Sequence, residues 1–236
     1  LSVDVTEMDE MPESGAILLI RPEEEAEQGL WTGTVQGVLG DEEDVAVQEA
    51  MVKLNHQVPT IFPEAALAEA AALPQMPDEA DFADRKDLRD MDFVTIDGAK
   101  AKDFDDAILV VKEPGGFRLW VAIADVSHYV APGSALDEEA RERGNSYYFP
   151  QSVEPMFPER LSNGLCSLNP NQPRLAMVVE TAYTADGVPG EYSVYPAVFE
   201  SKARLTYAQV NRALLLNEAE ERKNIEPVLP MLEQAL

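Results

Sequence analysis

The sequence has little of several residue types that mark particular classes of protein. A single cysteine, Cys166, and two histidines occur among its 236 residues. One cysteine excludes an internal disulfide framework, and the apolar neighbours of Cys166 predict a small packed hydrophobe. The apolar runs, such as Ala16–Ile20 and Ala107–Val111, are strand-sized and far shorter than the roughly 20 residues that span a bilayer. We therefore expect no membrane segment, and a reducing cytoplasm as the location.

Basic residues are also scarce, with 18 lysines and arginines against 44 acids and a net charge of −26. Such a charge opposes binding to phosphate backbones. The imbalance is uneven, however, because residues 93–212 hold 11 of the basic residues and only 16 of the acids. The acidity belongs mainly to the periphery, where it is typical of a surface that keeps a protein in solution.

The two ends of the chain lack the features of a complete protein. The sequence begins Leu-Ser-Val-Asp, with neither an initiator methionine nor a basic, apolar leader. It ends inside a helix that we predict from about Glu226. We therefore expect this chain to be a piece of a longer protein.

The first third of the chain predicts short strands followed by a helix. Alternating or apolar runs occupy 16–20, 31–39 and 44–48, and glycines separate them. This pattern favours part of a small β-barrel of the OB type. Residues 64–73 have strong helix propensity, and prolines and acids follow up to residue 92. We predict a partial OB-like domain over 1–63 and a helix with an acidic linker over 64–92.

The remainder, 93–236, predicts a mixed sheet with helices, so that the whole chain belongs to the α+β class. Ser134 and Gly144 are the expected cap and terminator of a helix that begins near Leu136. Thr206 to Gln209 is a capping-box pattern opening a helix that runs to about Asn217. The expected strands are 93–96, 107–112, 117–125, 176–184 and 191–200.

Four aspartates fall within ten residues of this second block. Asp97, Asp103, Asp105 and Asp106 lie between two runs that predict buried strands. A solvated acidic loop is the ordinary interpretation of such a charge run. Carboxylates held together at the edge of a core, however, repel one another unless a cation neutralises them. Hard oxygen ligands suit Mg²⁺ or Mn²⁺. Two such ions would support hydrolysis of a phosphodiester.

Several short motifs of the sequence also resemble those of a known family. Thr95–Gly98, Lys102–Ala107 and Leu119–Ser127 look like the catalytic (RNB) domain of the ribonuclease II and ribonuclease R family. Tyr148–Pro150, Leu161–Pro170 and Ala203–Tyr207 follow in the same order. The front block resembles, more weakly, the end of a cold-shock-type OB domain of the ribonuclease R branch.

This resemblance implies a processive, hydrolytic 3′-to-5′ exoribonuclease that releases nucleoside 5′-monophosphates from single-stranded RNA. The four aspartates match the active-site aspartates of the family. Our hypothesis is that Asp97 and Asp106 hold the tighter Mg²⁺, while Asp103 and Asp105 serve a second ion and the attacking water. Asp105→Asn should abolish hydrolysis and leave RNA affinity largely intact.

Other residues receive roles from the same resemblance or from their local pattern. Tyr148 matches the aromatic residue that stacks on a base near the RNA 3′ end and sets the length of the final product. Arg204 is a candidate contact to the RNA backbone, with a structural ion pair as the alternative. Asp125 fits a supporting role better than direct metal ligation. His128 lies in a strand-like segment and fits a packing role.

The family's catalytic domain continues well beyond the matched part and supplies an arginine and a second stacking aromatic that cannot be placed here. We therefore expect the 236 residues alone to bind Mg²⁺ weakly and to degrade RNA poorly, as a monomer. Two alternatives stay open. One is a noncatalytic RNA-binding module of the same fold, and the other is an acidic divalent-cation-binding protein without a nucleic-acid role.

Overall fold

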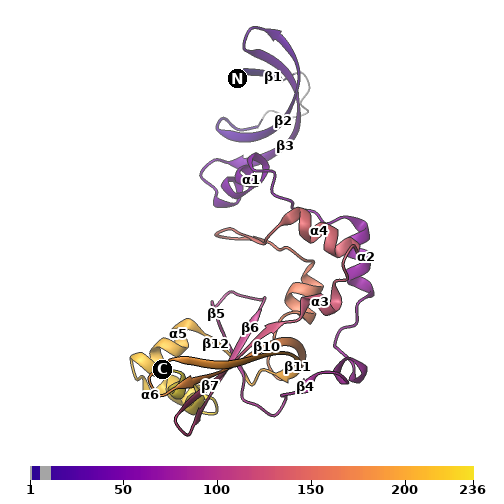
Figure 1. Cartoon of the computed structure of the whole chain (residues 1–236). Helices are drawn as coiled ribbons and strands as arrows, with labels where there is room; N and C mark the ends of the chain where they lie inside the picture. Colours follow the sequence, from indigo (N-terminus) through magenta and orange to yellow (C-terminus); the bar gives the residue numbers. More distant parts are fainter. Residues whose placement is uncertain (1, 6–11) are drawn as a thin grey trace. The chain divides into compact units, whose positions relative to one another are not determined.

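The computed structural model describes residues 2–5 and 12–236, which form two compact units (Figure 1). Unit 1 holds the described residues up to Ile61 together with Asn145–Glu154. Unit 2 holds Phe62–Gly144 and Pro155–Leu236. Asn145–Glu154 thus packs with the front of the chain although it lies far inside the second block of the sequence.

Unit 1 is built on a three-stranded sheet in the order β1-β3-β2. Strands β2 and β3 form an antiparallel hairpin, and β1 runs parallel to β3. A Cβ atom at Gly33 would lie 2.8 Å from Ile20 and 2.9 Å from Val3, so glycine lets the strands approach at this point. The OB-type barrel stays a prediction. The strands are β1 (Ser2–Val5), β2 (Ala16–Glu27) and β3 (Leu30–Asp41).

The strand predicted at 44–48 is wrong, because this segment opens helix α1 (Val45–Asn55). The Asp44 carboxylate accepts the backbone N–H of Ala46 at 2.9 Å and so caps the helix. Five alternating residues are compatible with the period of a strand and with the period of a helix. The cap at Asp44 and the eleven helical residues favour the helix. A short hairpin of β8 (Tyr147–Tyr148) and β9 (Val153–Glu154) completes unit 1.

Unit 2 is built on a mixed seven-stranded sheet in the order β12-β5-β6-β7-β10-β11-β4. The strands from β5 to β11 in this order pair antiparallel, and the edge strands β12 and β4 pair parallel with their neighbours. The strands predicted at 107–112 and 117–125 pair as one hairpin, and those predicted at 176–184 and 191–200 pair as another. The strands are β4 (Lys86–Asp87), β5 (Val94–Asp97), β6 (Asp106–Glu113), β7 (Gly116–Ala124), β10 (Pro173–Thr184), β11 (Pro189–Glu200) and β12 (Ala203–Thr206).

The helix predicted from the cap at Ser134 and the terminator at Gly144 is present in unit 2. Ser134 accepts the N–H of Asp137, and Gly144 has φ +74°, as predicted. The segment around His128 is helical, not strand-like, and α6 was not predicted. The helices are α2 (Glu64–Ala72), η1 (Glu79–Phe82), α3 (Val126–Tyr129), α4 (Ala135–Arg143), η2 (Arg160–Leu165), α5 (Tyr207–Val210), η3 (Asn211–Leu215), α6 (Ala219–Asn224) and α7 (Leu229–Ala235). η2 and η3 are π-helical turns.

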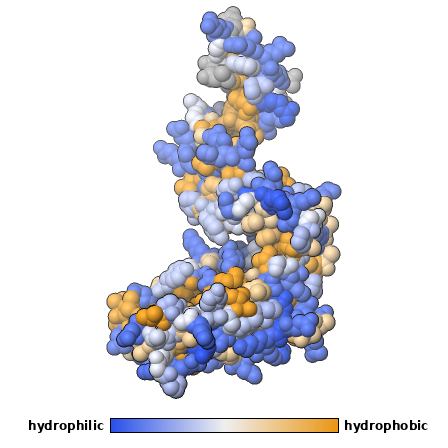
Figure 2. Space-filling view, in the orientation of Figure 1, coloured by the Kyte–Doolittle hydropathy of each residue, from blue (hydrophilic) through white to orange (hydrophobic). Residues whose placement is uncertain are grey.

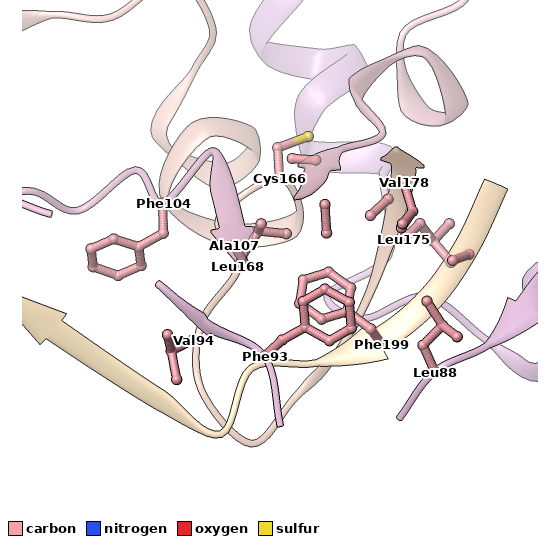
Figure 3. Packing of buried hydrophobic residues seen from close by; sticks show 14 of the residues in the cluster. Leu88, Phe93, Val94, Phe104, Ala107, Cys166, Leu168, Leu175, Val178 and Phe199 are labelled. Atoms are coloured by element: carbon pink, nitrogen blue, oxygen red, sulfur yellow. The ribbon is translucent and has the colours of Figure 1, made fainter. Parts of the chain in front are cut away.

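The core of unit 2 is a continuous hydrophobic cluster. The rings of Phe93 and Phe199 lie 4.9 Å apart at its centre (Figure 3). Ala66, Ala70 and Leu88, from the stretch that we predicted as helix and linker, are also buried in it. This stretch therefore packs as part of unit 2.

The surface is mostly hydrophilic, with apolar residues gathered near the C-terminal helices of unit 2 (Figure 2). Tyr207, Leu215, Leu216 and Leu236 are exposed there. In the described part of the chain, no helix combines the length and apolar character required to cross a bilayer.

Candidate active site

The four aspartates come from two neighbouring strands and the loop that joins them. Asp97 is the last residue of β5 and Asp106 is the first residue of β6. Asp103 and Asp105 lie on the connecting loop, residues 98–105, which we call the aspartate loop. Because β5 and β6 are antiparallel neighbours, the end of one strand lies beside the start of the other. The topology therefore brings all four residues to one end of the sheet.

Phe104 anchors the aspartate loop in the core. Its side chain is 2% exposed and lies among the buried residues of unit 2 (Figure 3). Its carbonyl accepts the N–H of Leu168 at 2.8 Å, and the carbonyl of Asp105 accepts the N–H of Ala124 at 2.9 Å. The backbone that carries Asp103 and Asp105 is thus tied to two other segments of the unit.

Two carboxyl groups of the cluster, those of Asp97 and Asp105, have raised pKa values. The pKa of Asp97 is raised, chiefly by burial and then by the charges of Asp106 and Asp103, while Arg204 opposes the shift. The pKa of Asp105 is raised as well. Although Asp105 has exposed surface, the surrounding protein desolvates its carboxyl, which is the largest cause, and the other three aspartates add to it. All four groups therefore interact electrostatically, as expected of adjacent carboxylates without a cation.

The donor set suits a hard divalent cation. Carboxylate oxygens are the preferred ligands of Mg²⁺ and Mn²⁺. Asp97 Oδ2 is buried and accepts no hydrogen bond from the described residues. Within residues 2–5 and 12–236, however, no three acidic, histidine or cysteine side chains stand close enough together to enclose an ion. The residue types and charges fit a cation, whereas a closed ligand cage is not formed.

Arg204 lies beside the aspartate loop, on strand β12. Its Nη2 donates to the carbonyl oxygens of Ala99 at 3.2 Å and Ala101 at 3.0 Å. Its guanidinium also lies 4.6 Å from the centre of the Phe104 ring, a cation–π contact. Arg204 thus holds the outer side of the loop, and its predicted contact to RNA stays a prediction.

Asp125, which follows β7, accepts hydrogen bonds instead of joining the cluster. Its carboxylate takes one from Arg85 at 2.6 Å and one from Ser127 at 2.7 Å. His128 Nε2 lies 3.0 Å from Asp81. These contacts connect the predicted linker to the end of β7. The partners Arg85 and Asp81 had no signal in the local sequence, because they lie about forty residues earlier.

Tyr148 lies in unit 1, on β8, and is 67% exposed. Its hairpin, residues 145–154, is held by helix α1. Both carboxylate oxygens of buried Glu49 are used, accepting the N–H of Gln151 at 2.6 Å and the hydroxyl of Ser152 at 2.7 Å. Lys53 Nζ lies 2.8 Å from Ser152 Oγ and 2.6 Å from Glu154.

Comparison with known proteins identifies the family of this chain. The sequence profile of the RNB domain matches residues 85–235. The chain belongs to the RNB family. The resemblance drawn from the ordered sequence motifs is therefore confirmed.

Curated relatives agree with this assignment. The chain is 48% identical over 204 residues to ribonuclease R of Vibrio parahaemolyticus, covering 86% of this chain and 24% of that protein. It is 47% identical over 204 residues to ribonuclease R of Escherichia coli, covering 86% of this chain and 25% of that protein. The chain thus spans about a quarter of the length of these relatives.

Solved structures show the same fold. Ribonuclease R of Mycoplasma genitalium in complex with double-stranded RNA matches with a TM-score of 0.81 at 35% identity, covering 98% of this chain and 42% of that one. The yeast pseudonuclease Ssd1 matches with a TM-score of 0.66 at 16% identity, covering 86% of this chain and 26% of that one. The second match shows the fold alone, and it shows that this fold does not by itself establish catalysis.

Proposed function

We propose that this chain carries the cation-binding aspartates of a hydrolytic exoribonuclease. The enzyme degrades single-stranded RNA processively from the 3′ end and releases nucleoside 5′-monophosphates. The observation that carries the proposal is that Asp97, Asp103, Asp105 and Asp106 lie at the adjoining ends of β5 and β6 and on the loop between them, in a chain of the RNB family. Four interacting carboxylates are the group that one or two divalent cations would stabilise.

The site residues have different roles in the proposed reaction. Asp97 and Asp106 would hold the first cation, and Asp103 and Asp105 would serve the second cation and the attacking water. A bound Mg²⁺ or Mn²⁺ polarises the phosphodiester and lowers the pKa of water. The exposed ring of Tyr148 stacks on a base, which requires only a π-face and is therefore independent of sequence. Arg204 contacts the RNA backbone while it holds the aspartate loop.

The decisive assay uses a polypeptide of full family length. The matched quarter of Escherichia coli ribonuclease R is replaced by this chain, and the chimera is incubated with 3′-labelled and 5′-labelled oligo(A). We expect release of nucleoside 5′-monophosphate that requires Mg²⁺ and starts at the 3′ end. Release from the 5′ end, or release in EDTA, would contradict the proposal.

Asp105→Asn in the chimera is the matched test of the site. The change keeps the shape of the side chain and removes its charge. We expect hydrolysis to fall at least about 100-fold, because a misplaced water and ion forfeit several kcal/mol of transition-state stabilisation. Oligo(A) affinity should change little. Turnover that survives the substitution would remove Asp105 from the mechanism.

A noncatalytic RNA-binding module is the second candidate, favoured by the absence of a closed three-ligand set in the described residues. In that case the chimera and its Asp105→Asn variant would both bind oligo(A) and release no mononucleotide. A chain that binds cations but no RNA would instead indicate an acidic cation-binding protein.

A further inference from the structure

One buried hydroxyl group bridges the two peptide groups that flank Asp103. Ser167 Oγ accepts the N–H of Phe104 at 3.1 Å and donates to the carbonyl of Lys102 at 2.9 Å. The donor and the acceptor belong to residues on either side of Asp103. A hydroxyl is the side-chain group that can accept and donate through one atom in this way. The bridge fixes the backbone on both sides of Asp103.

Ser167 is itself held firmly. Its residue is fully buried, at 0% exposure. Its carbonyl accepts the Arg174 Nε–H at 2.8 Å and the N–H of Asn169 at 2.8 Å. The next residue, Leu168, donates to the carbonyl of Phe104. The segment 167–168 therefore forms three hydrogen bonds to residues 102–104, from a position about 65 residues later in the sequence.

The aspartate loop is thus held on two sides. Ser167 and Leu168 hold it from the interior, and Arg204 holds it from outside through the carbonyls of Ala99 and Ala101. The two supports differ in charge. A neutral hydroxyl faces the peptides around Asp103, so the interior support adds no further charge beside mutually repelling carboxylates.

We infer that Ser167 is a positioning residue for divalent-cation binding, acting through the backbone of Asp103 and Asp105. This inference rests on the proposed function. Without the bridge, the mutual repulsion of the carboxylates would move the loop, and the ligands would have to be reordered when an ion binds. Groups that orient metal ligands without touching the metal change affinity about 10- to 100-fold when they are removed.

The test uses the full 236-residue chain and Mn²⁺ as the probe. Ser167→Ala removes the bridge. Ser201→Ala is the matched control, because Ser201 is also buried, at 1% exposure, and its hydroxyl donates to the carbonyl of Ala203, which is not a residue of the aspartate loop. Ser167→Thr retains the hydroxyl. Free Mn²⁺ is measured by electron paramagnetic resonance, and amide exchange of Phe104 is measured by NMR without metal.

We expect Ser167→Ala to weaken Mn²⁺ binding about 10-fold and to speed exchange at Phe104, with Val179 in β10 unchanged. Ser201→Ala should stay within about twofold of the parent, and Ser167→Thr should recover most of the affinity. Equal affinity of Ser167→Ala and the parent, or an equal loss in Ser201→Ala, would overturn the inference and leave the proposed function intact. Absence of saturable Mn²⁺ binding by the parent chain would also overturn the inference, whereas the proposed function is decided by the chimera.

Discussion

The aspartate loop of unit 2 and the Tyr148 hairpin of unit 1 are two short polar segments that are held in different ways. Ser167 bridges the first with one neutral hydroxyl. Glu49 binds the second with a buried carboxylate, and Lys53 contacts the same Ser152 hydroxyl that donates to Glu49. In both cases the support comes from a segment distant in sequence.

The difference follows from the charge of what is being held. Four carboxylates already repel one another at the aspartate loop, so a negatively charged support there would add to the repulsion. The one charged support described for this loop, Arg204, is a cation and lies on its exposed side. The hairpin contains one acidic residue, Glu154, whose Oε1 lies 2.6 Å from Lys53 Nζ in an ion pair. A buried glutamate can therefore serve as acceptor, because each of its two carboxylate oxygens accepts a hydrogen bond from the hairpin.

The largest change in stability should come from Glu49→Ala, which removes the support of the Tyr148 hairpin. The change leaves the N–H of Gln151 and the hydroxyl of Ser152 without their acceptor, in a place where Glu49 is only 7% exposed. We expect unit 1 to lose about 3 kcal/mol of unfolding free energy and the hairpin to lose amide protection. Urea unfolding and hydrogen exchange measure the two effects.

Glu43→Ala is the control for this change, since Glu43 is an exposed glutamate just before α1. It should alter stability by less than about 0.5 kcal/mol. If both variants were equally stable, the carboxylate would not be what holds the hairpin.

A smaller effect should come from the aromatic ring on that hairpin. Tyr148→Ala should weaken binding of labelled oligo(A) about 10-fold, as expected for one lost base stack, while Tyr148→Phe retains the affinity. Fluorescence anisotropy in EDTA gives the comparison. Glu49→Ala should weaken binding in the same direction, because it releases the segment that carries the ring. Equal affinity of the Ala and Phe variants would exclude stacking.

The smallest effect concerns pH and the aspartate loop. The pKa values of Asp97 and Asp105 are raised above the ordinary 3.8, so the folded chain retains their protons longer than the unfolded chain does. Their contribution to stability is therefore lost as pH rises through the raised values. Asp105→Asn should be neutral near about pH 4 and should stabilise unit 2 by a fraction of a kcal/mol near about pH 7. Urea unfolding in EDTA measures the difference, and a difference that shrank with rising pH would contradict it.

Local chemistry in the sequence predicted much of unit 2. The helix from Ser134 to Gly144 and the strands at 107–112 and 117–125 depend on neighbouring residues, and the structure has them. Helix α1 was misassigned because five alternating residues do not distinguish the two periods, and the cap at Asp44 decides between them.

The supports of the site could not be predicted in the same way. Ser167 lies about 65 residues from the loop that it bridges, and Glu49 lies about 100 residues from the hairpin that it binds. Such contacts are set by the tertiary fold, whereas capping and turn signals act over a few residues. The sequence therefore predicted which residues carry charge or a ring, and the structure shows what holds their backbone.

The parallel pairing of β12 with β5 has a consequence for how the protein is made. Thr206 pairs with Asp97 across the sheet, so the strand that carries the first aspartate gains its outer neighbour only after more than a hundred further residues have left the ribosome. Contacts of this sequence separation form slowly. The nascent chain therefore carries an unpaired β5 edge until residues 203–206 have been made, and a stall before residue 203 would leave that edge open to pairing with other chains.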